Sequence, residues 1–87
     1  MVSPMTDFEI AYEADFQEVM ERITPGHKYR LVMGENNVNN RLIHILSVVD
    51  GDYFVCKCWA KRKRVWFYYV ENWYYFHLRL DKLTEVR

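Results

Sequence analysis

The chain lacks the features by which most catalytic and cofactor-binding sites are recognised. It has no glycine-rich phosphate loop and no serine, histidine and aspartate spacing typical of a nucleophilic enzyme. It also lacks a run of about 18 apolar residues, which a membrane span requires. We therefore expect no enzyme activity, no cofactor and no membrane partner. Residues 1–6 lack the basic and apolar regions of a signal peptide, which predicts a cytoplasmic protein of a bacterial or host cell.

Cysteine is also scarce, since Cys56 and Cys58 are the only two. One residue separates them on a predicted strand, so their side chains point to the same side about two residue rises apart. That separation is too large for an easy disulfide. No further metal ligands lie nearby in the sequence, so we expect buried free thiols and no metal site.

The 87 residues predict a single domain, residues 1–87, because typical domains contain about 50 to 250 residues. Thr6 and Glu9 fit a capping box at the start of a helix. Apolar residues then recur at spacings of three and four, and acids fill the opposite face. The apolar stripe consists of Phe8, Tyr12, Phe16, Val19, Met20 and Ile23. Thr24-Pro25-Gly26 ends the pattern, which predicts an amphipathic helix over about residues 6–23.

Five strands joined by turns follow the helix in our interpretation. The expected strands are Tyr29–Met33, Arg41–Val49, Asp52–Ala60, Val65–Val70 and Trp73–Leu80. Asp50-Gly51 is a strong hairpin signal, residues 34–40 form an asparagine-rich loop, and residues 81–87 read as a polar tail. The predicted fold class is α+β, with the helix packed on a four- to five-stranded antiparallel meander over about residues 28–80. The alternative is that this sheet curls into a small barrel.

The turns also predict which residues lie opposite one another. The expected pairs are Ile43–Cys58, Ile45–Cys56, Val48–Tyr53, Cys58–Phe67, Trp59–Trp66, Phe67–Phe76 and Tyr69–Tyr74. Because side chains alternate strictly along a strand, these pairs define two faces. One face collects Ile43, Ile45, Phe54, Cys56, Cys58, Phe67, Tyr69, Phe76 and Leu78. The other collects Leu42, Leu46, Val55, Trp59, Trp66, Tyr68, Val70, Trp73 and Tyr75, together with His44, Lys57 and His77.

Both faces are apolar, yet the chain offers one helix to cover them. Isolated domains rarely expose large contiguous apolar patches, so the second face predicts a contact surface for another macromolecule. It carries cations among its aromatic residues, and we expect the helix to cover the first face. Two copies of the chain could instead bury this surface against each other in a homodimer.

Charge is unevenly distributed although the formal net charge is zero. Six acids and one base lie between Asp7 and Arg22, whereas eleven bases and six acids follow from Lys28 onward. The run Lys61-Arg62-Lys63-Arg64 falls at a predicted hairpin tip between Trp59 and Trp66. Cations beside stacking rings are typical of single-stranded nucleic-acid binding. A solvated loop, with a tryptophan pair that adds about 0.2–1 kcal/mol to the hairpin, explains the same residues without a ligand.

The histidines do not form a recognisable site. His77 beside Trp66, with Arg64 and Arg79 nearby, is the one cluster that resembles a compact ribonuclease. No carboxylate accompanies it on the predicted strands, so we do not expect catalysis there.

No motif matches a family residue by residue. The order of one helix followed by five antiparallel strands is similar to Sm-like and other small-barrel proteins, which transfers no function. The size and aromatic content resemble accessory or inhibitor proteins of phages and mobile elements. We therefore expect a non-enzymatic protein that occupies a surface of a larger protein or complex. The expected contact residues are Trp59, Lys61, Arg62, Lys63, Arg64, Trp66, Tyr68, Trp73, Tyr75 and His77. The alternative is a nucleic-acid-binding β domain that uses the basic hairpin.

Overall fold

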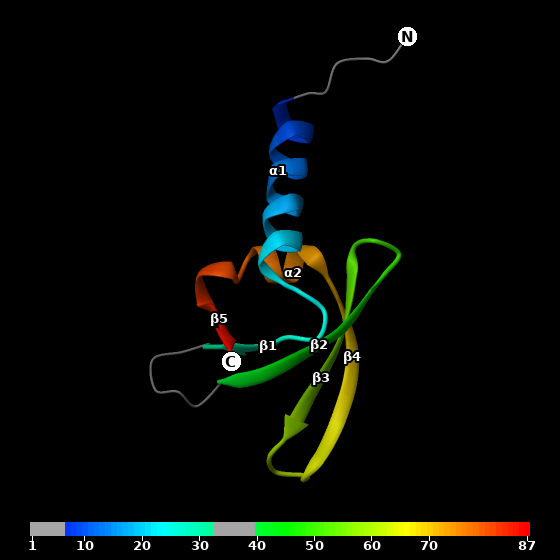
Figure 1. Ribbon diagram of the computed structural model, residues 1–87, viewed down its shortest axis with the longest axis vertical. Helices are drawn as coiled ribbons and strands as arrows, with labels where there is room; N and C mark the ends of the chain where they lie inside the picture. Colours follow the sequence, from blue (N-terminus) through cyan, green and yellow to red (C-terminus); the bar gives the residue numbers. More distant parts are fainter. Residues whose placement is uncertain (1–6, 33–39) are drawn as a thin grey trace.

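The computed structural model describes residues 7–32 and 40–87. The elements, in chain order, are α1 (Asp7–Arg22), β1 (Lys28–Leu31), β2 (Arg41–Val49), β3 (Tyr53–Ala60), β4 (Val65–Asn72), α2 (Trp73–His77), the 3₁₀ turn η1 (Leu80–Lys82) and β5 (Leu83–Val86). The predicted fold class is confirmed, because the N-terminal helix packs on a five-stranded antiparallel sheet (Figure 1). The predicted cap at Thr6 and most of the asparagine-rich loop lie outside the described residues.

The end of α1 is tied to the sheet by backbone hydrogen bonds. Gly26, at a φ of 90° that suits glycine, donates its N–H to the carbonyl of Ile45 at 2.7 Å. The Ile45 N–H in turn donates to the carbonyl of His27 at 3.0 Å. The Tyr29 hydroxyl accepts a hydrogen bond from the N–H of Thr24 at 2.7 Å. These bonds set the direction in which α1 leaves the sheet.

The sheet is open, with strand order β4-β3-β2-β1-β5. β4 and β5 form its two edges, so the described strands do not close into the small barrel that the sequence left as an alternative. Ile43 lies opposite Cys58, Ile45 opposite Cys56 and Trp59 opposite Trp66, which confirms those predicted pairs.

The predicted pair Val48–Tyr53 is wrong by one residue. The register shifts between Ile45 and Ser47, so Val48 lies opposite Phe54. This bulge places an extra residue on β2, which a two-residue turn cannot reveal from sequence. Asp50 and Gly51 both have positive φ, at 53° and 79°, as expected for the tight connection.

The predicted strand Trp73–Leu80 is wrong, because this segment forms α2 and the start of η1. Asn72 is the N-cap of α2, and its side chain accepts a hydrogen bond from the N–H of Tyr74 at 2.9 Å. Asparagine suits both a hairpin turn and a helix cap, and the following six residues are apolar enough for either. The predicted pairs Phe67–Phe76 and Tyr69–Tyr74 are therefore wrong.

The predicted polar tail is also corrected, because residues 83–86 form β5. This strand pairs with β1, placing Leu83 opposite Leu31 and Val86 opposite Lys28. A four-residue segment has little strand preference by itself, and the free edge of β1 supplies its hydrogen-bond partners.

The core lies between the helices and one face of the sheet. Its buried side chains are Val19, Ile23, Tyr29, Leu31, Ile43, Ile45, Phe54, Cys56, Trp73, Phe76, Leu80 and Leu83. Trp73 joins the two helices, since the rings of Tyr12 and Phe16 on α1 meet it edge-on at 5.0 and 5.4 Å. Phe76 meets Phe54 of β3 in the same manner at 5.2 Å, so α2 links α1 to the sheet.

Replacing Trp73 with alanine should destabilise the protein by about 3–5 kcal/mol, because it opens a cavity where both helices meet. Urea unfolding followed by circular dichroism measures this loss. Trp66→Ala is the matched control, since Trp66 is 43% exposed and should cost about 1 kcal/mol or less. Equal losses in the two variants would contradict the placement of Trp73 in the core.

Two neighbouring residues that differ in burial test whether residues 83–86 form the strand β5. Leu83 is 7% exposed, whereas Thr84 is exposed. Leu83→Ala should cost about 2–3 kcal/mol in the free energy of unfolding and Thr84→Ala about 0.5 kcal/mol or less. The same small effect for both variants would mean that residues 83–86 behave as a solvated tail.

Candidate functional site

One face of the sheet is turned away from both helices, and we call it the outer face. Its residues alternate with the buried ones and come from all five strands. They are Lys28, Arg30, Leu42, His44, Ser47, Val49, Tyr53, Val55, Lys57, Trp59, Trp66, Tyr68, Val70, Thr84 and Val86, with Leu46 at the bulge. None of them belongs to the buried core, so the predicted second apolar face is present and uncovered by the described helices.

The large side chains of the outer face are exposed to an unusual extent. Tyr68 is 64% exposed, Val70 54% and Leu46 44%, while Trp59 and Trp66 are each exposed by about two fifths. The face is therefore a largely aromatic and aliphatic surface. Such a surface is typical of an interaction site rather than of an isolated soluble domain.

The centre of the outer face is a row of directly opposed residues that crosses the whole sheet. In order from β4 to β5 it consists of Tyr68, Lys57, His44, Lys28 and Val86. Lys57 extends its ammonium over the ring of Trp66, 4.3 Å from the centroid. Trp66 also meets the rings of His44 and Trp59 at 5.2 Å. These contacts hold the rings in place.

Charge on the outer face is of one sign. Lys28, Arg30 and Lys57 are its charged residues, and no carboxylate occupies an outward position in the described strands. Burial lowers the pKa of His44, and the positive charges of Lys28 and then Lys57 lower it further. Both effects favour the neutral form of His44, which lies between the two lysines. Sequence reasoning missed Lys28 and Arg30, although their alternation with Tyr29 and Leu31 was a usable signal.

The hairpin between β3 and β4 carries the predicted basic run at its tip. Lys61, Arg62, Lys63 and Arg64 are all exposed, and Arg64 adopts a positive φ of 53° while its N–H donates to the carbonyl of Ala60 at 2.8 Å. On the side of the sheet opposite to the outer face, Phe67 and Arg41 line an open hollow of about 700 Å³ beside these cations. The tip is therefore basic on both sides.

Three predicted contact residues do not lie on the outer face. Trp73 is 2% exposed and belongs to the core, because the segment after Asn72 is a helix rather than a strand. Tyr75 packs against the core, with the guanidinium of Arg79 3.8 Å from its ring centroid. His77 lies on α2, where its Nε2 is 3.5 Å from a carboxylate oxygen of Asp15.

The predicted cluster of His77, Trp66, Arg64 and Arg79 is consequently not formed. His77 ends α2 and Arg79 follows it on the helix side, whereas Trp66 belongs to the outer face and Arg64 to the hairpin tip. The ribonuclease-like arrangement that the sequence allowed has no geometric basis.

The two cysteines are free and buried, as predicted. Burial, and after it the negative charge of Glu71, raises the pKa of Cys56 to about 12. Burial also raises the pKa of Cys58. Thiols held in the protonated form are poor nucleophiles and poor metal ligands. Within residues 7–32 and 40–87, no group of three or more histidine, cysteine, aspartate or glutamate side chains is placed to hold a metal ion.

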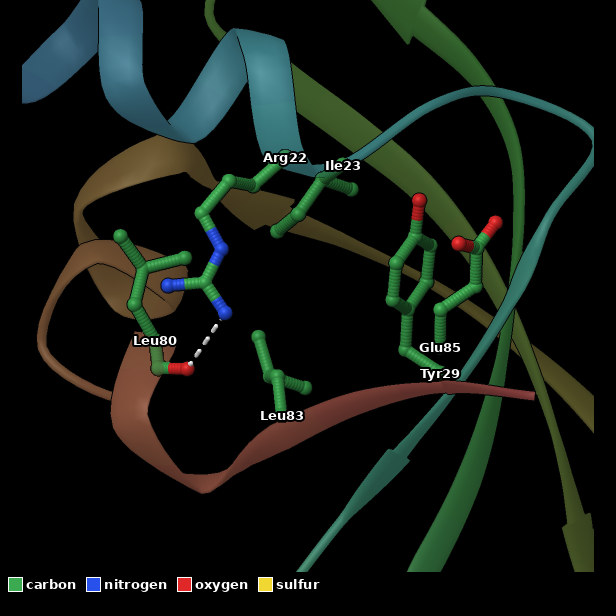
Figure 2. A pocket seen from close by; sticks show the side chains of 6 residues that line it. All are labelled: Arg22, Ile23, Tyr29, Leu80, Leu83 and Glu85. Atoms are coloured by element: carbon green, nitrogen blue, oxygen red, sulfur yellow. Dashed lines mark hydrogen bonds between the residues drawn. The ribbon is translucent and has the colours of Figure 1, made fainter.

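A small cavity of about 160 Å³ lies where the end of α1 meets β1 and β5 (Figure 2). Figure 2 shows Ile23, Leu83 and Tyr29 around it, with Arg22 donating a hydrogen bond to the carbonyl of Leu80 at 3.1 Å. Ligand sites usually enclose about 300–1,000 Å³, so this volume is small for one. The hydrogen bond at this cavity joins the end of α1 to η1, the turn that precedes the C-terminal strand.

No protein-family model matches this chain, and neither a curated protein nor a solved structure matches it. Among the described residues, no helix is both long and apolar enough to cross a membrane.

The lowered pKa of His44 predicts a pH dependence of stability with a definite sign. The unfolded chain, with its histidine pKa near 6.5, takes up a proton that the folded protein binds less readily. The contribution of His44 is therefore fully present above that pH and is lost as the pH falls toward the lower folded pKa. Urea unfolding between about pH 8 and about pH 5 should show that His44→Gln loses less stability than the wild type. Parallel curves for the two proteins would contradict this.

Proposed function

We propose that this protein is a non-enzymatic binding protein that occupies a surface of a larger protein through its outer face. The observation that supports this most directly is the uncovered aromatic surface of Trp59, Trp66 and Tyr68, continuous with exposed aliphatic side chains. Buried tryptophan and tyrosine side chains dominate the binding energy of protein interfaces. The cations at the centre and rim of this surface favour a partner with carboxylates opposite them.

The aliphatic half of the outer face favours a protein over a nucleic acid. Near the turn between β2 and β3, Leu46, Val49 and Val70 are exposed by 44%, 41% and 54%. These side chains offer nothing to a base or a phosphate, whereas an apolar protein surface buries them favourably. Tyr53, 39% exposed, extends the same region.

The position of Lys57 also favours a protein over a nucleic acid as the partner. Its ammonium covers one face of the Trp66 ring, and His44 and Trp59 pack edge-on against that ring. Single-stranded nucleic-acid binders stack bases on free ring faces. Trp66 is arranged as one part of a preformed patch rather than as an open stacking platform.

A protein that occupies such a surface acts by excluding the partner's other ligands, which is the inhibitory mode typical of small phage-type proteins. The proposal places this action in the cytoplasm, where two free buried thiols are expected to remain reduced. No chemical step is required of the protein itself.

A photoreactive phenylalanine analogue at position 68 tests the proposal in a lysate of the native host. Tyr68 is 64% exposed, so the substitution should leave the fold intact while placing the probe within the contact surface. We expect one specific protein to be cross-linked, and Trp66→Ala in the same chain should lower its yield strongly, since central aromatic residues contribute about 2 kcal/mol or more.

The matched control carries the same analogue at Leu78, which is 57% exposed but lies on the helix side. It should capture none of the protein that the probe at position 68 captures, and treatment with nuclease should change neither result. Equal capture from both positions would place the interaction elsewhere than on the outer face.

Nucleic-acid binding is a second candidate because the hairpin tip is basic on both sides and borders both the tryptophan pair and Phe67. Replacing Lys61, Arg62, Lys63 and Arg64 together with serine separates the two candidates. If nucleic acid is the ligand, fluorescence anisotropy with a labelled single-stranded oligonucleotide should show tight binding by the wild type. The variant should bind weakly and with a flatter salt dependence. If a protein is the ligand, the variant should mainly associate more slowly with it.

A further inference from the structure

Helix α1 has a second, exposed face that the core does not use. Opposite its buried residues lie Ile10, Ala14 and Gln17, flanked by Glu13, Glu18 and Glu21, and all six side chains are exposed. The spacing of three and four places them on one side of the helix. We call this surface the acidic face of α1. It combines a narrow, weakly apolar strip with carboxylates on either side.

The acidic face projects away from the sheet. Val19 and Ile23 anchor the C-terminal half of α1 in the core, and Tyr12 and Phe16 hold its middle against Trp73. Figure 1 shows the helix axis leading away from the strands, so the N-terminal half stands clear of the sheet. The acidic face is therefore accessible to another molecule.

The chain carries its own electrostatic complement on the outer face, where Lys28, Arg30 and Lys57 have no acidic neighbour within that surface. We propose that the acidic face of α1 docks on the outer face of a second copy, and that the contact is reciprocal within a two-fold dimer. Carboxylates of α1 then lie against the lysines, and Ile10 lies against the aromatic residues. In a two-fold dimer each contact made by one copy is repeated by the other, so both pairs of surfaces are satisfied.

Interface size favours the reciprocal arrangement over a single contact. A 16-residue helix is about 24 Å long and about 10 Å wide, so one docked helix covers roughly 240 Å² on each partner. One contact then removes only about 500 Å² from water in total, which is the size of a weak crystal contact. Two reciprocal contacts remove about 1,000 Å², which reaches the lower end of specific interfaces.

This dimer would cover the surface that the proposed function assigns to a partner protein. The inference rests on the proposed function in this respect, because self-association and partner binding compete and dissociation of the dimer exposes the outer face. Because exposed ion pairs are individually weak and screened by salt, the dimer should be weak and salt-sensitive.

Sedimentation velocity on the full chain over about 5–200 μM tests the inference directly. We expect a monomer–dimer equilibrium at low salt, with the dimer fraction falling at least several-fold as sodium chloride is raised to about 0.5 M. Two variants reverse the charge of one surface each. The helix reversal combines Glu13→Lys, Glu18→Lys and Glu21→Lys. The sheet reversal combines Lys28→Glu and Lys57→Glu. Each variant alone should be monomeric, since like charges then face each other.

An equimolar mixture of the two reversed variants should restore the dimer, because the helix of each now matches the sheet of the other. Lys82→Glu with Arg87→Glu is the matched control, since both residues are exposed and lie off the outer face. That control should dimerise as the wild type does. Circular dichroism checks that each variant folds, and Lys28→Glu with Arg30→Glu replaces the sheet reversal if Lys57 proves necessary for folding.

Other outcomes would overturn the inference. A wild type that stays monomeric at all concentrations excludes it. A dimer that persists in the helix reversal and in high salt shows that the outer faces associate with each other instead. A mixture that fails to dimerise, although each variant is folded, shows that the two surfaces do not meet. Cross-linking from Tyr68 to a host protein does not require the dimer, so the proposed function is tested separately.

Discussion

The burial of Trp73 between two helices is the interaction on which the rest of the structure depends. Asn72 caps a helix of only five residues, and this cap places Trp73 where Tyr12 and Phe16 of α1 close over it. Phe76, one turn later, contacts Phe54 in the sheet. So short a helix has little stability by itself, and its packing contacts hold it. Without this connection, only the C-terminal half of α1 would be packed in the core, through Val19 and Ile23.

Placing both helices on one side of the sheet makes the two faces of the sheet different. The inner face packs against both helices and carries the core residues of β1, β2, β3 and β5, to which β4 adds only the half-buried Tyr69, while the rings of the outer face stay exposed. A chain of 87 residues has little surface to bury in any case, so leaving an aromatic face exposed has a cost in stability. Such a cost is understandable where another molecule covers that face.

Charge follows the same division. Acids gather on the projecting helix, cations on the outer face and at the hairpin tip, and the formal net charge is zero. Between Lys28 and Lys57, the lowered pKa of His44 favours its neutral form, which limits the positive charge at the centre of the face. The molecule is thus a dipole with a preformed aromatic patch at its positive side, and both proposals made for it arise from this arrangement.

The sequence alone determined α1, the central hairpins and the uncovered face, because period, turn residues and alternation are local properties. The Asp50-Gly51 turn and the opposition of Trp59 and Trp66 followed from such local rules. Only the tertiary structure decided the secondary structure of residues 73–86. Asn72 suits a turn and a cap equally, so the packing of Trp73 and Phe76 selected the helix, and the free edge of β1 selected a strand for Leu83–Val86. For that reason the outer face does not contain Trp73, Tyr75 or His77. It does contain Lys28 and Arg30, because β1 pairs with β2.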